Sequence, residues 1–374
     1  MAEEEIKKNN QYPNSLNIFI TEDCNLQCRY CFLDKTYKKS QLTFSDLKRA
    51  IDLLFSFPSK IKTIAFNGGE PLLEYPLLKE TCLYIREKAE KEAVKVNLAT
   101  MTNGTLLSRE HCQFFEKNQI IVKISIDGDK KTHDTNRLFR DSSRKSSYLA
   151  IVNNLKNFNN KSKIAASLVF TPQNVINLFK NIKSLEKLGL GFIEFYPDMY
   201  AFWSKEQLTE FRKQFKQIIK YYISFFSKKK LKSIFKNSLL DSVLNQIEIV
   251  GLEGSRCQKI HLAPDGNFYF CDKVFSLPLS KRKQYITGSI KKGIDNNKRL
   301  MLLHFFQKKC QKVIGQQNDC CFCPIGHYLY FSSQNQNLKE RFSDFFAVNK
   351  IYLDNFLLIK KKLTLNPLFA KLYQ

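Results

Sequence analysis

The feature that most constrains the fold of this chain is a repeated alternation of short apolar runs with patterns typical of helices. Six runs of strand length come before residue 200: Leu16–Ile20, Ile61–Phe66, Val94–Thr100, Ile120–Ile126, Ile164–Phe170 and Phe192–Tyr196. Helical patterns separate them, and the capping signal Thr43-Phe-Ser-Asp46 opens the first. This alternation predicts an α/β fold with parallel strands and covering helices.

Unusual polar residues gather where these runs end. They are Cys24 to Cys31, Gly68 to Glu70, Asn103, Ser125 to Asp127, Thr171 and Asp198. In barrels of parallel strands the chemistry lies at the carboxyl ends of the strands. We therefore expect an open barrel of six strand–helix units with one functional site at that edge.

Three cysteines follow the first run in a C-x3-C-x2-C spacing: Cys24, Cys28 and Cys31. Three thiolates on one loop can hold three corners of a cubane iron–sulfur cluster, which leaves one iron open. An open coordination position distinguishes catalytic metal sites from structural ones. The other interpretations are buried small hydrophobes or half of a zinc site, although no His or Cys follows at zinc-finger distance.

This motif, with the aromatic Tyr30 before its third cysteine, resembles the signature of the radical SAM superfamily. The resemblance implies a partial (β/α)6 barrel and a [4Fe–4S] cluster on Cys24, Cys28 and Cys31. It implies that the open iron chelates S-adenosylmethionine, which is cleaved reductively to a 5′-deoxyadenosyl radical that abstracts hydrogen from a substrate. The chain is therefore expected to be an enzyme, a radical SAM oxidoreductase.

Two strand ends supply further expected contacts to S-adenosylmethionine. Gly68-Gly69-Glu70 resembles the family's GGE motif, which binds the amino group of that cofactor. Glycines also let a backbone approach a ligand closely, although a simple turn explains the triplet equally well. Asn103, in Thr-Asn-Gly, is either a turn residue or a cofactor contact.

The fourth run ends in Ser125-Ile-Asp127, whose two polar side chains point to the same face and suit a ribose diol. The sequence continues with His133-Asp-x-x-Arg137, which resembles radical SAM enzymes that carry extra cluster domains. We expect Arg137 to pair with the cofactor carboxylate and His133 to be structural.

A second set of cysteines lies near the C-terminus: Cys257, Cys271, Cys310, Cys320, Cys321 and Cys323. Four thiolates from a hairpin and a later loop can close a complete cubane. The region resembles the auxiliary-cluster domain called SPASM, or its shorter form, twitch. We expect one auxiliary [4Fe–4S] cluster on Cys257, Cys271, Cys320 and Cys323. Cys321 could replace Cys320 as a ligand, and Cys310 is a further candidate ligand. A zinc ion bound by the same four residues is the other alternative.

Two details refine this auxiliary region. Leu329 and Ser333 stand where the full SPASM pattern has cysteines, so a second auxiliary cluster is not expected. Asp272 directly follows Cys271, and a carboxylate beside a cluster can take a proton from a substrate radical. In the sulfatase-maturing branch of the superfamily an aspartate in this position has that role; the plain alternative is an exposed turn carboxylate.

The expected domains follow from these motifs. Residues 1–15 are expected to form a flexible arm, 16–203 the barrel, 204–250 a helical bridge, 251–333 the auxiliary domain with a β-hairpin turning at Pro264-Asp-Gly266, and 334–374 a helical tail. The charged N-terminus and the absence of an 18-residue apolar run predict a cytoplasmic chain without a membrane span. Eleven cysteines in a reducing compartment favour metal over disulfides.

The net charge of +25 favours acidic partners, unless it reflects a general lysine bias, and nucleic acid is unlikely because no RNA-binding motif is present. We expect the substrate to be a peptide or protein side chain, possibly acidic, and the electron donor to resemble flavodoxin or ferredoxin. Alternatives are formylglycine formation in a sulfatase, dehydrogenation of a small molecule, or a non-enzymatic iron–sulfur or zinc module.

Overall fold

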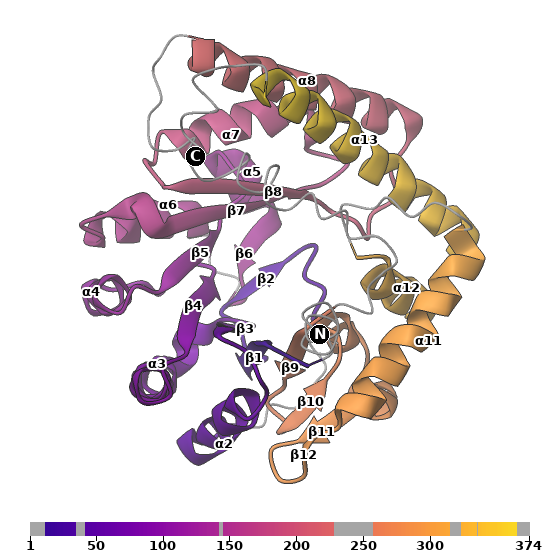
Figure 1. Cartoon of the computed structure of the whole chain (residues 1–374). Helices are drawn as coiled ribbons and strands as arrows, with labels where there is room; N and C mark the ends of the chain where they lie inside the picture. The colour runs from indigo at the N-terminus through magenta and orange to yellow at the C-terminus, as the bar shows by residue number, and fades with distance from the viewer. Residues whose placement is uncertain are drawn as a thin grey trace.

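A computed structural model describes residues 12–34, 42–141, 145–227, 257–314, 323–334 and 336–364. Its centre is a curved ten-stranded sheet with the strand order β12-β11-β10-β9-β1-β3-β4-β5-β7-β8 (Figure 1). A small second sheet pairs β2 (Leu26–Cys28) with β6 (Arg137–Phe139). The curved sheet determines where the predicted site residues meet.

Six parallel strands form the barrel part of this sheet: β1 (Ser15–Thr21), β3 (Ile61–Gly68), β4 (Lys95–Thr102), β5 (Ile121–Ser125), β7 (Ile164–Phe170) and β8 (Phe192–Pro197). They are the six predicted runs, and their ends differ from the prediction by at most two residues. The predicted α/β fold with a partial barrel is therefore confirmed.

Helices cover the outer face of the barrel strands (Figure 1). They include α2 (Phe44–Phe55), α3 (Tyr75–Lys91), α4 (Arg109–Lys117), α5 (Lys130–Asn136), α6 (Ser147–Asn154) and α7 (Leu178–Glu186). Short 3-10 turns lie at Pro71–Glu74, Leu155–Asn157, Lys161–Lys163 and Val175–Asn177. The outward-facing strand residues, such as Ile18, Ile64 and Leu98, are fully or almost fully buried against these helices.

The inner face of the barrel is more polar and more accessible than the outer face. Along β3 and β4 buried residues alternate with partly or fully exposed ones, so the inner positions are not closed by packing. Interiors of complete barrels are instead filled by branched apolar side chains. Inner residues here include Lys123, Ser125 and Glu194, none of them fully buried. The barrel therefore encloses a partly accessible space at its centre.

The region after Cys257 continues the barrel sheet. Strand β9 (Lys259–Leu262) pairs in parallel with β1, and β10 (Asn267–Tyr269), β11 (Ile286–Ser289) and β12 (Gly293–Ile294) add antiparallel neighbours. The predicted hairpin is confirmed, and Gly266 at its turn has φ +74°, a conformation that glycine adopts without strain.

Two helices in this region were not predicted, because only short strands and turns were expected after Cys257. They are α11 (Asn296–Ile314) and α12 (Pro324–Ser333), which lie beside the extension of the sheet (Figure 1). Shorter turns are η7 (Asp272–Ser276), α10 (Leu279–Arg282) and η8 (Lys283–Tyr285).

Two long helices close the far edge of the barrel. Helix α8 (Lys205–Ser227) begins the predicted helical bridge, whose remainder lies outside the described residues. Helix α13 (Leu338–Thr364) lies within the predicted helical tail. The hydroxyl of Tyr352 in α13 donates to the carbonyl of Phe195 in β8 at 2.6 Å, and its ring packs on Phe211 and Phe215 of α8. Most of the expected N-terminal arm also lies outside the described residues.

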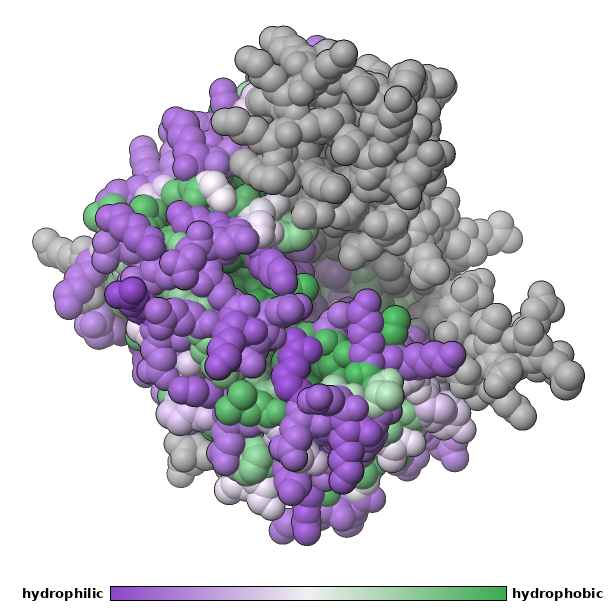
Figure 2. Space-filling view, turned by 60° about the vertical axis from the view of Figure 1, so that its left-hand side comes forward, coloured by the Kyte–Doolittle hydropathy of each residue, from purple (hydrophilic) through white to green (hydrophobic). Residues whose placement is uncertain are grey.

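The described surface turned forward in Figure 2 is mostly hydrophilic, with small separate hydrophobic patches. Within the described ranges, every helix is too short or too polar to cross a membrane.

The capping box of α2 gives a direct test of a local sequence signal. Thr43 accepts a hydrogen bond from the Asp46 N–H, and the Asp46 side chain accepts one from the Thr43 N–H. Thr43→Ala should lower the free energy of unfolding by about 1 kcal/mol in a denaturant titration. The control Ser56→Ala removes only an exposed hydroxyl that donates to Leu53 and should change it by less than about 0.5 kcal/mol. Equal effects would contradict the capping role.

Candidate active site

The loop that carries Cys24, Cys28 and Cys31 leaves the carboxyl end of β1. Cys24 and Cys28 are partly buried and Cys31 is exposed. Cys28 lies in β2, where it pairs with Arg137 of β6. The small sheet therefore brings the predicted Arg137 to the cysteine loop, across more than a hundred residues of sequence.

Nitrogen donors point at two of the three sulfurs. Cys24 Sγ accepts from the Leu26 N–H at 3.4 Å and from Asn103 Nδ2 at 3.7 Å. Cys28 Sγ accepts from Arg137 Nη1 at 3.8 Å. Such donors stabilise thiolates and tune the clusters that the thiolates hold. Burial raises the pKa of the Cys24 thiol to about 12, and a coordinating metal ionises a thiol of this kind.

The surroundings of these thiols suit a cluster, which three thiolates of one loop can hold. Among the described residues, no group of three His, Cys, Asp or Glu side chains is arranged to hold a single metal ion. Donors aimed at the sulfurs, an exposed third thiol and the open chamber fit a [4Fe–4S] cluster on Cys24, Cys28 and Cys31.

The two glycines of the predicted GGE motif let the cysteine loop approach β3. A Cβ on Gly68, whose φ is +140°, would lie 2.2 Å from the Thr21 carbonyl oxygen, and one on Gly69 would lie 2.0 Å from that of Asp23. The Gly69 and Glu70 N–H groups donate to these same two carbonyls, at 2.9 and 2.7 Å. Any side chain here would push the cysteine loop away.

Glu70 is fully buried and its carboxylate is already bonded. It accepts from the Thr102 hydroxyl at 2.7 Å and from the N–H groups of Asn103 at 2.6 Å and Leu72 at 3.0 Å. Burial raises the pKa of Glu70 to about 7, although these bonds oppose the shift. Glu70 thus fixes the Asn103 loop, and Asn103 in turn reaches Cys24 and Asn25. Its contact with the cofactor amino group stays a prediction.

Asp127 lies at the centre of a second buried group. Its carboxylate accepts from the Tyr30 hydroxyl, from Arg137 at 3.1 Å and from the Val169 N–H at 3.1 Å. The Arg137 guanidinium also lies over the Tyr30 ring, 5.3 Å from its centroid. Burial raises the pKa of the Tyr30 hydroxyl further above its usual value. The predicted residues Tyr30, Asp127 and Arg137 are therefore brought together, beside Cys28.

Ser125 stands apart from this group, on the accessible inner face of β5. Its register partner on β7 is Ser167, whose partner on β8 is Glu194. Lys123 Nζ spans the inner face to Glu194 at 2.8 Å. Sequence analysis did not single out Lys123 or Glu194, although charged residues inside two apolar runs were a visible signal. Lys123 and Glu194 make the inner face of the barrel polar.

Three cysteines of the second set also come together. The Cys323 thiol lies close to Cys257 and Cys271, so the negative charge of one thiolate makes its neighbour harder to ionise. Burial also raises the pKa of the partly buried Cys271, whereas the Cys323 side chain is exposed. Cys320 and Cys321 lie outside the described residues, so the fourth ligand is not settled. Cys310 belongs to α11 and is fully buried in the apolar core near Tyr328.

Asp272 and Lys273 lie between the two sets of cysteines. Lys273 Nζ is 3.5 Å from the Asp272 carboxylate and 4.2 Å from the ring centroid of Phe32, the neighbour of Cys31. Burial would raise the pKa of Asp272, but the charges of Lys273 and of His261 outweigh it and lower this pKa to about 2. Asp272 is therefore a firmly ionised carboxylate, and the proton-accepting role predicted for it is untested.

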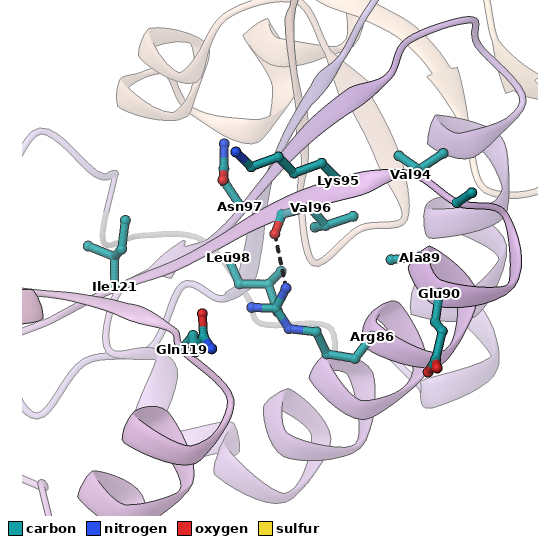
Figure 3. Close-up of a pocket in the computed structure, with 11 residues that line it drawn as sticks. Arg86, Ala89, Glu90, Val94, Lys95, Val96, Asn97, Leu98, Gln119 and Ile121 are labelled. Carbon is teal, nitrogen blue, oxygen red and sulfur yellow. Dashed lines mark hydrogen bonds between the residues drawn. The ribbon is translucent and has the colours of Figure 1, made fainter. Parts of the chain in front are cut away.

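A separate cavity of about 570 Å³ lies at the amino ends of β4 and β5. Figure 3 shows its lining, where Arg86 of α3 donates to the Val96 carbonyl at 2.9 Å. The cysteine loop leaves the opposite, carboxyl ends of the strands. This cavity is therefore not part of the candidate active site.

Comparison with known families supports this geometry. The family model described as Radical SAM superfamily matches residues 18–180. This part of the chain belongs to the radical SAM superfamily. The match covers the cysteine loop and the strand ends that surround it, and it confirms the resemblance drawn from the cysteines. The cofactors of this enzyme family, a [4Fe–4S] cluster and S-adenosylmethionine, fit the residues present.

Relatives and solved structures extend the likeness beyond that domain. The chain is 29% identical over 185 residues to the cysteine-type anaerobic sulfatase-maturating enzyme of Clostridium novyi, covering 47% of this chain and 49% of that protein. The enzyme of the same name from Clostridium perfringens (strain ATCC 13124) is 24% identical over 266 residues, covering 67% and 71%. The solved structure of native anSMEcpe with bound AdoMet and Kp18Cys peptide superposes with a TM-score of 0.64 at 20% identity, covering 90% and 99%, which shows a shared fold.

The buried His133 gives a pH-dependent test of the site's scaffold. Its Nδ1 accepts from the Asp127 N–H at 3.2 Å, and burial lowers its pKa from 6.5 to about 4. The unfolded chain therefore binds a proton on His133 below about pH 6.5, whereas the folded chain binds it only near pH 4. As the pH falls from 6.5 to 4, proton binding favours the unfolded chain and the free energy of unfolding decreases. At 1.36 kcal/mol per pKa unit the loss is about 3 kcal/mol.

His133→Asn keeps an acceptor for Asp127 and removes the titration. Its free energy of unfolding should fall less than that of the wild type between pH 7 and pH 4, measured by urea titration. His261 and His327 are buried with lowered pKa values too, so part of the wild-type dependence should persist. Identical pH profiles for the two proteins would show that His133 does not titrate in this window.

Proposed function

We propose that this chain is a radical SAM enzyme that modifies a side chain of a peptide or protein. The observation that carries the proposal is a contact between the neighbours of the two cysteine sets. Phe32, beside Cys31, contacts Lys273, which lies two residues after Cys271. The likeness to a fold solved with both AdoMet and a peptide supports a peptide substrate.

When bound to Cys24, Cys28 and Cys31, the cluster and S-adenosylmethionine supply a 5′-deoxyadenosyl radical that abstracts hydrogen. The chain's own residues prepare the site for this chemistry. Asn103 and Arg137 direct N–H donors at the sulfurs, and Glu70 and Asp127 hold these two residues in place. Because these carboxylates are buried and already hydrogen-bonded, the site spends little free energy on rearranging them during the reaction, as expected of a preorganised site.

Some polar groups of the site are already hydrogen-bonded within the chain, and others remain available to bind the cofactor. The carboxylates of Glu70 and Asp127 already accept bonds from the chain. We assign contact with S-adenosylmethionine first to the partly exposed backbone of Gly68 and Gly69 and to Ser125.

At the second site, Cys257, Cys271 and Cys323, with Cys320 or Cys321, would hold one auxiliary cluster. A zinc ion on the same residues is the alternative. Asp272 would accept a proton from the substrate, since it is ionised and lies beside Cys271; its low pKa makes it a weak base. The positive net charge suits an acidic peptide, and a flavodoxin or ferredoxin would supply electrons.

Formylglycine formation in a sulfatase is the second candidate. The relatives named as cysteine-type sulfatase-maturating enzymes and the position of Asp272 favour it. Against it, Leu329 and Ser333 occupy the positions expected for further cysteines, and both lie in α12. Dehydrogenation of a small molecule and a binding module without catalysis are less well supported.

A hydrogen-transfer experiment tests the proposal. The anaerobic holoenzyme would be given dithionite, S-adenosylmethionine and a pool of peptides whose Cys and Ser residues carry deuterium at Cβ. We expect deuterium in 5′-deoxyadenosine by mass spectrometry, and none with the same peptides carrying Ala at those positions. Cofactor cleavage without deuterium transfer from any peptide would count against Cys and Ser side chains as the substrate.

Variants of Asp272 separate its role from radical formation. Asp272→Asn should still cleave S-adenosylmethionine but yield no modified peptide in the same assay. The control Asp265→Asn changes a carboxylate at the turn of the preceding hairpin, which accepts hydrogen bonds from the Tyr269 hydroxyl and the Asn267 N–H. A normal product yield from Asp272→Asn would remove this residue from the mechanism.

A further inference from the structure

Residues 272–282, which follow Cys271, contact both ends of the loop that carries Cys24, Cys28 and Cys31. This segment comprises η7 and α10 and belongs to the auxiliary region. Besides the Lys273–Phe32 contact described above, Phe275 and Arg282 join this segment to the two ends of the loop. Neither residue takes part in the chemistry described above.

Arg282 holds the start of the loop. Its side chain is 1% exposed and donates from Nη1 to Glu22 Oε1 at 2.6 Å; the Glu22 side chain is 3% exposed. Glu22 lies two residues before Cys24. The other donors of the guanidinium are fixed by its own segment, Nε on the Leu277 carbonyl at 2.7 Å and Nη2 on the Phe275 carbonyl at 2.9 Å. The rigid fork of arginine suits this threefold attachment.

Phe275 holds the end of the loop. Its carbonyl also accepts from the Asp34 N–H at 3.0 Å, and Asp34 lies three residues after Cys31. Its ring packs against Phe19 of β1, with 4.3 Å between centroids. One carbonyl therefore joins Arg282 to the far end of the cysteine loop.

The arrangement is poorly explained by stability alone. Glu22 Oε2 is buried and has no hydrogen-bond partner among the described residues. A buried ion pair with an unsatisfied oxygen is costly, and well-packed apolar residues often replace such pairs without loss of stability. A pair of this kind is better suited to fixing the relative position of two segments.

We propose that Phe275 and Arg282 form a clamp that positions the Cys24–Cys31 loop and links it mechanically to the auxiliary cysteine site. Arg282 is a positioning residue that acts through Glu22, and Cys271 begins the segment that carries the clamp. The inference rests on the proposed function in one respect, that the loop holds the catalytic cluster.

The test compares three variants of the full chain after anaerobic reconstitution. Arg282→Met removes the clamp, and Arg282→Lys keeps the charge without the fork. The matched control is Arg86→Met, because Arg86 donates to two backbone carbonyls, of Val96 and Asn118, at the opposite end of the barrel (Figure 3). Cluster retention is followed by iron loss to a chelator, and the cluster's environment by the change in its EPR spectrum on adding S-adenosylmethionine.

For Arg282→Met we expect a roughly 10- to 100-fold loss of cluster affinity at the Cys24 loop, as is typical when a partner of a ligand is removed. The EPR change on adding S-adenosylmethionine should shrink, with an intermediate effect for Arg282→Lys. Arg86→Met should lower the melting temperature and leave both readouts as in the wild type. Should Arg282→Met not fold, Arg282→Lys and Glu22→Gln must show the same shift.

A wild-type EPR change in Arg282→Met and Arg282→Lys, with only the melting temperature lowered, would overturn the clamp alone. A wild type without any such EPR change would overturn the proposed function, and the clamp with it. The two failures are therefore distinguishable.

Discussion

Strand β1 is hydrogen-bonded on both sides, to β3 on one and to β9 on the other, and the rest of the site depends on this double pairing. Leu16 to Ile18 align with Ile64 to Phe66 and with Ile260 to Leu262. The barrel and the auxiliary region are thus parts of one sheet. Backbone hydrogen bonds, and not a flexible connection, set the separation between the two cysteine sites.

Around the end of β1 the structure uses buried polar contacts to hold the site in place before any ligand arrives. Glu70 holds Asn103 in place, and Asp127 holds Tyr30 and Arg137 in place. Asn103 then donates a hydrogen bond to the sulfur of Cys24, and Arg137 donates one to the sulfur of Cys28. Each carboxylate is buried with several donors, which offsets the cost of removing it from water. A site built in this way fixes its thiols and leaves the inner wall of the barrel open to substrate.

Much of this fold could be predicted from the sequence, because the six parallel strands are buried on the outer face and bounded by turn residues. The capping box at Thr43 and the hairpin at Gly266 carry equally local signals. Helix α11 was missed because its apolar residues, from Leu300 to Phe306, form a nearly continuous run in place of a periodic pattern.

What the sequence could not show is which distant residues meet. The pairing of β1 with β9 joins residues separated by more than two hundred positions, as does the bond of Arg282 to Glu22. No local propensity encodes such contacts. The same limit applied to Glu70 and Asp127, whose residue types suggested ligand contacts but whose carboxylates bond to neighbouring strands and loops.

Iron content after anaerobic reconstitution tests most directly the claim that one sheet carries two cluster sites. With four irons per cubane, the wild type should hold about eight irons per chain, and the Cys24/Cys28/Cys31→Ala variant about four. A wild type with about four irons and a variant with none would contradict the account. The auxiliary cysteines would then hold no cluster, and the chain would be a radical enzyme with a single cluster.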